Sequence, residues 1–174
     1  GKGVPINQHK AFELFSTAAE RGFAPSQNYL GTMYANNFPN PSRVFFNYNR
    51  AKYWYEKSAN QNYAPAQYNL GNLYRRGRGA KKDVVEAVAW FDKSARQGVP
   101  EAQYFLGVAL ATGTAVPRNL GLAEEWLCKA SSQGMADANV ALKTYLRTSS
   151  ETCQLTVASS FVQAEGLINL PREY

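Results

Sequence analysis

The segment SANQNYAPAQYNLGNLY, residues 58–74, is one of three similar segments that follow one another at nearly constant spacing. The other two are AAERGFAPSQNYLGTMY, which begins at residue 18, and SARQGVPEAQYFLGVAL, which begins at residue 94, so the offsets are 40 and 36 residues. A weaker copy, ASSQGMADANVALKTYL, begins 36 residues later at residue 130 and has Lys143 in place of the glycine. A fixed period of this length indicates an array of repeated supersecondary units.

Each period contains a first helix pattern built around a Leu-Gly pair. A small residue, the Leu, the Gly and a larger residue lie at spacings of four, five and eight, which place them on one helical face. The copies are Ser26, Leu30, Gly31 and Tyr34; Ala66, Leu70, Gly71 and Tyr74; and Ala102, Leu106, Gly107 and Leu110. A glycine within a helix costs about 1 kcal/mol relative to alanine, so its recurrence predicts that another helix packs closely against it.

The second helix pattern is an apolar stripe at positions i, i+3, i+4, i+7 and i+8, as expected for a helix with one buried face. Its copies are Ala11, Leu14, Phe15, Ala18 and Ala19; Ala51, Trp54, Tyr55, Ser58 and Ala59; Ala87, Trp90, Phe91, Ser94 and Ala95; and Ala123, Trp126, Leu127, Ala130 and Ser131. Large central residues and small end residues favour helices that interlock. We expect Trp90 to fill a space between helices.

Residues at the helix boundaries recur as well. Asn7, Asn47, Asp83 and Asn119 precede the second helices and are good N-caps. Those helices end at residues that tolerate the left-handed conformation, namely Gly22, Asn62, Gly98 and Gly134. The predicted helices span residues 7–21, 25–36, 48–61, 65–76, 84–97, 101–111, 120–133 and 137–146, followed by a C-terminal helix. The chain is therefore predicted to form an all-α, right-handed superhelix of helical hairpins.

The stretch AQYNLGNLYRRGRGAKKDVVEAVAWFDKSARQG, residues 66–98, resembles the Sel-1-like repeat, a variant of the tetratricopeptide repeat. The shared pattern runs through Ala, Leu-Gly, Tyr, a Gly-x-Gly loop, Asp, Ala, Trp-aromatic and a final Gly. The resemblance covers residues 1–146 and implies an α-solenoid of about four repeats, of which the first is incomplete. We expect residues 147–174 to form a capping segment over the last apolar face.

No group of residues predicts catalysis. His9 is the only histidine, which excludes a histidine-based metal cluster, and a Ser-His-Asp or Cys-His arrangement would have to use it. A carboxylate pair of the glycosidase type stays open, although the acidic residues of the second helices lie on predicted polar faces. We therefore expect neither an enzyme nor a bound cofactor or metal.

The formal net charge of the 174-residue chain is +6. Its densest basic run consists of Arg75, Arg76, Arg78, Lys81 and Lys82, without interleaved aromatic residues or a nucleic-acid motif. We expect no nucleic-acid ligand, and the charge fits either solubility alone or an acidic partner. Since no apolar run approaches the length of a membrane span, membrane insertion is not expected.

The first helices of tetratricopeptide-like stacks line the concave side, so their positions off the Leu-Gly face are the candidate partner-binding residues. These are Asn28, Thr32, Tyr68, Asn72, Arg75, Arg76, Tyr104 and Val108. Tyrosine and arginine are enriched at binding hot spots, whereas the alternative is that the tyrosines only pack between helices. The long loop of residues 37–46 is a second candidate contact, because Phe38, Phe45 and Phe46 are either buried locally or available to a partner.

Cys128 occupies a slot that is polar in the earlier copies, and Cys153 begins the predicted cap. Two buried free thiols and a disulfide between them are both compatible with these positions, and a disulfide would indicate an oxidising compartment. The resemblance implies a scaffold or adaptor of an exported bacterial protein, periplasmic or secreted, that binds another protein. The alternatives are an immunity protein that neutralises a secreted toxin, a carboxylate-based hydrolase and a spacer between domains.

Overall fold

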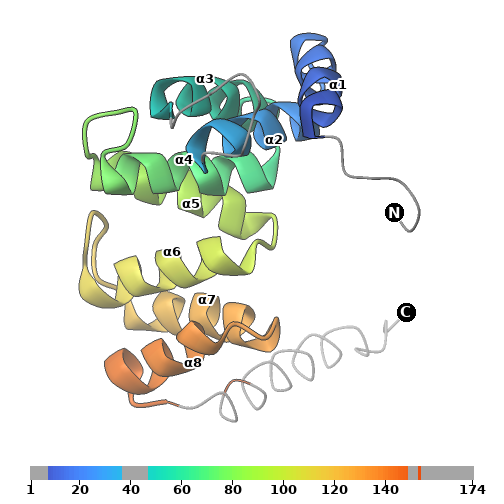
Figure 1. Ribbon diagram of the computed structural model, residues 1–174. Coiled ribbons are helices and arrows are strands. Elements are labelled where there is room, and N and C mark those ends of the chain that lie inside the picture. The colour runs from blue at the N-terminus through green and yellow to red at the C-terminus, as the bar shows by residue number, and fades with distance from the viewer. Residues whose placement is uncertain (1–7, 37–46, 149–152, 154–174) are drawn as a thin grey trace, which may run out of the picture. The chain divides into compact units, whose positions relative to one another are not determined.

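The computed structural model describes residues 8–36, 47–148 and 153, and every regular element in them is helical (Figure 1). The elements are α1 (Gln8–Glu20), α2 (Ala24–Ala35), α3 (Tyr48–Ala59), α4 (Ala64–Arg76), α5 (Val84–Arg96), α6 (Pro100–Thr112), α7 (Leu120–Ser132), α8 (Ala136–Ala141) and a π-helical turn, η1 (Leu142–Leu146). The all-α prediction is thus confirmed for this part of the chain. The predicted boundaries of the first seven helices are correct to within two residues, whereas the eighth changes to π-helix after Ala141.

The chain divides into two compact units, residues 1–102 and residues 103–174. In the first unit each helix packs against the next along the chain, from α1 to α5. In the second unit α7 packs against α8 and η1. This sequential packing is the helical-hairpin arrangement predicted from the period, because helices joined by short turns lie antiparallel and side by side.

The predicted N-caps are confirmed for three helices. The side-chain Oδ1 atoms of Asn47, Asp83 and Asn119 each accept a backbone N–H three residues further on, at 3.0 Å, whereas Asn7 lies outside the described residues. The predicted ends of the second helices all have positive φ: Gly22 (+92°), Asn62 (+63°), Gly98 (+92°) and Gly134 (+86°). Local sequence therefore sets both ends of these helices.

The glycines of the first helices lie at the closest approach between neighbouring helices. A Cβ atom on Gly71 of α4 would lie 2.7 Å from the Phe91 ring of α5 and 3.1 Å from the carbonyl oxygen of Ala87. Gly31 meets Tyr55 in the same way, also at 2.7 Å. The close packing predicted from the recurring glycine is therefore confirmed, and its partner is the large residue of the second-helix stripe.

We expect Gly71→Ala to lower the free energy of unfolding by about 1–3 kcal/mol, although alanine is the better helix former. The new methyl group would press on the ring of Phe91, whose exposed fraction is 1%, and on the Ala87 carbonyl oxygen of the backbone. Urea denaturation followed by circular dichroism measures the change. Gly121→Ala is the matched control, because a Cβ there meets nothing closer than the Asn119 side chain at 3.6 Å. A Gly71→Ala protein as stable as the wild type would contradict the steric argument.

The stripe on the second helices is confirmed at most positions, with one correction. In α5 the stripe residues Ala87, Phe91, Ser94 and Ala95 are buried, whereas Trp90 is only half-buried. Its indole Nε1 donates to Glu86 Oε1 at 2.8 Å. Trp90 packs against the core that includes Leu70 and Leu73, so it contacts a neighbouring helix as predicted, but it lies at the edge of that core. The fully buried ring beside Gly71 belongs to Phe91.

The same stripe position in α1 is occupied by Leu14, whose exposed fraction is 63%. The half-buried Trp54 of α3, Trp90 of α5 and Trp126 of α7 hold the corresponding positions. A lysine one turn later lies over each of these indoles, at 5.4, 4.0 and 4.4 Å from the ring centroid, respectively. This position therefore lies at the edge of the core, where the lysine stem and charge cover the ring.

Buried glutamines connect successive hairpins. Gln67 has an exposed fraction of 2%, its Nε2 donates to Asn62 Oδ1 at 3.0 Å, and its Oε1 accepts from Gln97 Nε2 at 2.7 Å. Equivalent bonds join Gln61 to Gln27 and Gln133 to Gln103. Since a buried amide left without a partner is costly, these bonds favour one register of each helix on its neighbour.

Candidate functional site

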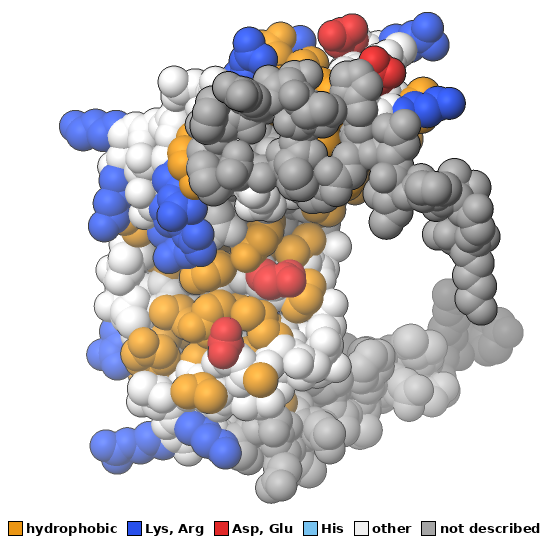
Figure 2. Space-filling view, in the orientation of Figure 1, with side chains coloured by type: hydrophobic (Ala, Val, Ile, Leu, Met, Phe, Trp, Pro, Cys, Tyr) orange, Lys and Arg blue, Asp and Glu red, His pale blue; other side chains and the backbone are white. Residues whose placement is uncertain are grey.

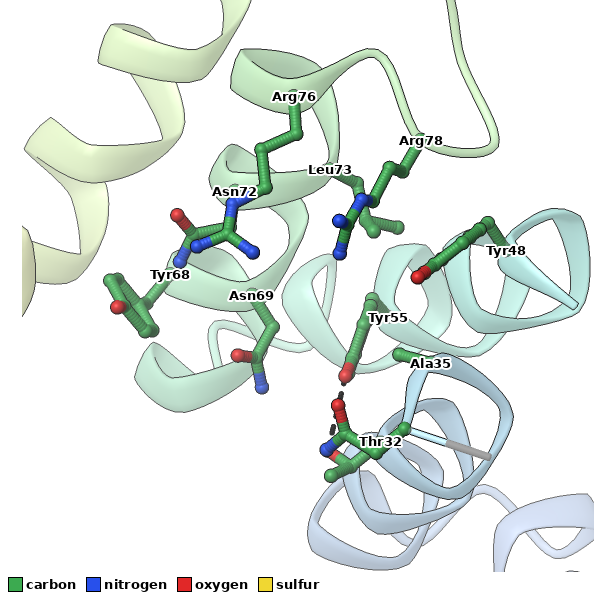
Figure 3. A pocket seen from close by; sticks show the side chains of 11 residues that line it. Thr32, Ala35, Tyr48, Tyr55, Tyr68, Asn69, Asn72, Leu73, Arg76 and Arg78 are labelled. Carbon is green, nitrogen blue, oxygen red and sulfur yellow. Dashed lines mark hydrogen bonds between the residues drawn. The ribbon is translucent and has the colours of Figure 1, made fainter. Parts of the chain in front are cut away.

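A pocket of about 200 Å³ lies among α2, α3, α4 and the loop after α4, within the first unit (Figure 3). Its lining consists of Thr32, Ala35, Asn36, Tyr48, Tyr55, Tyr68, Asn69, Asn72, Leu73, Arg76 and Arg78. The α4 residues among them are spaced as one helical face. The lining combines tyrosines, asparagines and arginines and contains no acidic side chain.

Tyr55 is a lining residue with an exposed fraction of only 3%, and it is uncharged at neutral pH. Its hydroxyl group lies 3.1 Å from Thr32 Oγ1, which itself donates to the Asn28 carbonyl oxygen at 3.1 Å (Figure 3). Because that bond uses the only hydroxyl proton of Thr32, the Tyr55 hydroxyl must be the donor to Thr32. Burial raises the pKa of Tyr55 to about 12, so the phenol keeps its proton.

Two asparagines of α4 are held in place by neighbouring side chains. Asn69 Nδ2 donates to Asn28 Oδ1 at 2.9 Å, which ties α4 to α2. Arg75 donates to Asn72 Oδ1 from Nε at 3.4 Å and from Nη2 at 3.2 Å. Since the oxygen of Asn72 faces Arg75, its amide N–H groups point away from Arg75 and are available as donors.

Two arginines supply the charge of the pocket. The guanidinium of Arg78 lies 5.1 Å from the ring centroid of Tyr48, so it stacks on a lining tyrosine. The loop that carries it reaches α3 because Gly79 has φ +69° and because a Cβ there would collide with the Tyr48 carbonyl oxygen. Arg76 has no hydrogen-bond or ion-pair partner in the described part of the chain. Lys and Arg side chains also gather on the side of the α4–α5 loop in Figure 2.

The structure brings four predicted residues together in this pocket: Thr32, Tyr68, Asn72 and Arg76. Two others contact lining residues, since Asn28 accepts a hydrogen bond from Asn69 and Arg75 donates to Asn72. Tyr68 also lies beside the Phe91 ring of α5, with 6.0 Å between centroids, so packing and pocket lining are combined in one side chain. A role in partner binding stays a prediction for all of these residues.

The other predicted contacts lie elsewhere. Tyr104 and Val108 belong to the second unit, where both are half-buried against a core that includes Leu127 and Leu142. The loop residues Phe38, Phe45 and Phe46 lie outside the described residues. The predicted binding residues of α2 and α4 thus belong to the first unit, and those of α6 belong to the second unit.

Seven lining residues were not among the predicted ones: Ala35, Asn36, Tyr48, Tyr55, Asn69, Leu73 and Arg78. Tyr55 belongs to the buried stripe, and its ring crosses over Gly31 so that its hydroxyl group reaches α2. The other stripe copies have Phe15, Phe91 or Leu127 at this position. The single hydroxyl-bearing residue in that series is a sequence signal that points to the pocket.

The second unit contains a disulfide between Cys128 and Cys153, with 5.4 Å between the Cα atoms. The sequence analysis names the same two cysteines as candidates for a disulfide. Both are buried, at 8% and 6% exposure, although the repeat position of Cys128 is polar in earlier copies. Cys128 packs in the core of this unit beside Leu127 and Leu142, where a sulfur atom suits the apolar surroundings.

Groups that could hold a metal ion are absent among the residues that the structure describes. The side chain of His9 is outside that set. None of the described helices is both long and apolar enough to span a membrane.

Comparison with protein families finds the Sel1 repeat, whose model matches residues 1–23, 24–63, 64–99 and 100–135. Among solved structures, a protective antigen of uropathogenic Escherichia coli strains with an SLR fold is 35% identical, with a TM-score of 0.73. The match covers 83% of this chain but only 30% of that one, so this chain spans less than a third of that protein.

Two further structures have similar helical repeats. A Sel1 repeat protein from Oxalobacter formigenes is 30% identical, with a TM-score of 0.68, over 77% of this chain and 98% of that one. Cysteine-rich protein B of Helicobacter pylori is 22% identical, with a TM-score of 0.54, over 79% and 97%, and shows similarity of fold alone. No curated protein matches the chain.

Proposed function

Because the chain belongs to the Sel1 repeat family, we propose that it is a binding module that holds a partner protein over the pocket of α2, α3 and α4. Sel1 repeats are scaffolds for protein–protein interaction and are generally not catalytic. The observation that carries the proposal is the pocket lining, in which tyrosine, asparagine and arginine side chains from several helices converge. These residue types supply large contact area and hydrogen bonds at protein interfaces.

The fixed positions of the lining side chains support binding. Asn69, Asn72 and Tyr55 are each held by a hydrogen bond, and Arg78 is stacked on Tyr48. A partner therefore meets groups whose rotamers are already restricted, and binding loses less side-chain entropy than on a mobile surface.

The chemistry of the lining favours binding over hydrolysis. The eleven lining residues include no carboxylate, imidazole or thiol, and the Tyr55 phenol is kept neutral. A carboxylate-based hydrolase requires a pair of acids that face a shared cavity. The lining therefore supports an interaction role.

We place this module in an exported bacterial protein, as a scaffold or adaptor in the periplasm or outside the cell. The disulfide supports this placement, since such bonds persist mainly in oxidising compartments. The net charge of +6 fits an acidic partner surface. An immunity protein that neutralises a secreted toxin is the second candidate, supported by the same disulfide. An immunity protein, unlike a scaffold or adaptor, would form a tight complex that inhibits the activity of its partner.

We expect Tyr68→Ala combined with Arg76→Glu to weaken partner binding at least about tenfold, equivalent to about 1.4 kcal/mol. The variant removes a large lining ring and reverses the charge of Arg76, which has no ion-pair partner among the described residues. The partner is first isolated from the native organism by cross-linking, and its affinity is then measured by calorimetry with purified proteins.

Arg21→Glu is the matched control, because it makes the same charge change on an exposed residue of the first unit outside the pocket. Circular dichroism should show the same helical content for the three proteins at the temperature of the binding measurement, although the double variant should melt at a lower temperature because Tyr68 packs beside Phe91. Wild-type affinity in the double variant would contradict the proposed surface.

A further inference from the structure

The groups available to a ligand at the charged side of the pocket are mainly hydrogen-bond donors. Arg76 and Arg78 contribute two guanidinium groups, which stay protonated at any physiological pH. Asn72 adds its amide N–H groups, because Arg75 occupies its oxygen. Among the described residues that line the pocket, no acidic side chain balances these charges.

The hydroxyl groups of the lining residues Thr32 and Tyr55 are already engaged with each other. Thr32 donates to the Asn28 carbonyl oxygen, and Tyr55 donates to Thr32. Since Tyr55 is neutral, it provides no negative charge to compensate the guanidinium groups. The described lining therefore has two guanidinium groups and no acidic side chain, next to neutral, aromatic walls.

We propose that this pocket binds a carboxylate group of the partner protein, between Arg76 and Arg78 and with a further hydrogen bond from Asn72. The inference rests on the proposed function and specifies which chemical group enters the pocket. Guanidinium groups and carboxylates form paired, charge-assisted hydrogen bonds, and both arginines are exposed and accessible to a partner. The neutral walls suit the peptide segment that carries the carboxylate.

The helix ends around the pocket favour a monoanion over a phosphate. Ala35 is the last residue of α2 and Arg76 is the last residue of α4, so both helices contribute their C-terminal ends to the lining. Each such end carries about half a negative charge, which disfavours a dianion more than a carboxylate. The two arginines carry two positive charges, and the two helix ends together contribute about one negative charge. One negative charge of a ligand is then balanced, whereas two are not.

NMR titration of the ¹⁵N-labelled chain tests the inference with three peptides of matched length. The first, acetyl-Gly-Ser-Ala-Glu-Ala-Gly-amide, has only a side-chain carboxylate, whereas the second has Gln in place of Glu and a free C-terminus. The third has Gln and a C-terminal amide, so it has no carboxylate. We expect the side-chain amide signals of Asn72 to shift at concentrations at least tenfold lower with one of the first two peptides than with the third.

The comparison of the first two peptides distinguishes a side-chain carboxylate from a chain terminus as the source. Arg76→Gln and Arg78→Gln should each abolish the preference over the neutral peptide, whereas Arg21→Gln should retain it. Equal shifts with all three peptides would overturn the inference. Saturation of the same signals by inorganic phosphate at lower concentration than by either carboxylate peptide would also overturn it.

Failure of this inference and failure of the proposed function give different results. If the isolated partner binds the wild type but not the Tyr68→Ala, Arg76→Glu variant, while the peptides are not distinguished, only the carboxylate assignment is overturned. If that variant binds the partner with full affinity, the proposed binding surface itself is overturned, and the carboxylate assignment that rests on it is overturned too.

Discussion

Phe91→Ala is expected to lower the free energy of unfolding by about 3–5 kcal/mol, the largest loss that we expect from a single substitution in this chain. Phe91 has an exposed fraction of 1%, and its ring lies directly against the backbone of Gly71. Because Gly71 has no side chain to move into the vacated space, truncation leaves a cavity between α4 and α5. Urea denaturation followed by circular dichroism measures the loss.

Val85→Ala is the control for this substitution, since Val85 lies on the same helix with an exposed fraction of 64%. Its loss should stay below about 0.5 kcal/mol, as for most surface substitutions. Trp90→Ala should cost less than Phe91→Ala, because the indole is half-buried at the edge of the core. A larger loss for Trp90 than for Phe91 would contradict the packing described above.

Features that depend on local sequence and on the repeat period could be predicted. The caps at Asn47, Asp83 and Asn119 need only a side-chain oxygen three residues before a free N–H group, and all three form. The close contact at Gly71 was predictable because a helix glycine that recurs at a fixed position needs a packing reason.

The depth of each side chain in the core could not be predicted in the same way. Trp90 and Phe91 are adjacent in the stripe, about 100° apart on the helix, and the pattern alone does not decide which of them faces Gly71. The buried Ser94 illustrates the same limit, because its hydroxyl donates to the Ala64 carbonyl oxygen at 2.8 Å. The stripe predicts that Ser94 faces inward, but its hydrogen-bond partner Ala64 can be identified only from the packing of α4 on α5.

The candidate site was predicted in part on α2 and α4 and was missed on α3 and on the loop after α4. Tyr68, Asn72 and Arg76 follow from the spacing within α4 alone. Tyr48 and Arg78 come from α3 and from the loop after α4, and they meet because that loop turns through Gly79 onto α3. Contacts between separate elements depend on how hairpins stack and on the course of the loops, which no single periodic pattern contains.

Reduction of the Cys128–Cys153 bond is expected to lower the free energy of unfolding by about 3 kcal/mol on the chain-entropy model. The cysteines are separated by 25 positions, and the bond limits the conformations of that loop in the unfolded chain. Both sulfur atoms lie in the core of the second unit, so the bond also holds Cys153 against that core. Urea denaturation with and without a reductant measures the effect.

The Cys128→Ala, Cys153→Ala variant separates the cross-link from side-chain packing. Its stability should not respond to the reductant, and it should resemble the reduced wild type, because alanine removes the bond and little buried volume. A thiol assay on the denatured, unreduced wild type should detect no free thiol, since the bond accounts for both cysteines. Two free thiols in protein folded under oxidising conditions would contradict the bond.

A loss of about 3 kcal/mol is a large part of the stability of a typical domain, about 5–15 kcal/mol, so protease resistance should fall sharply in a reducing buffer.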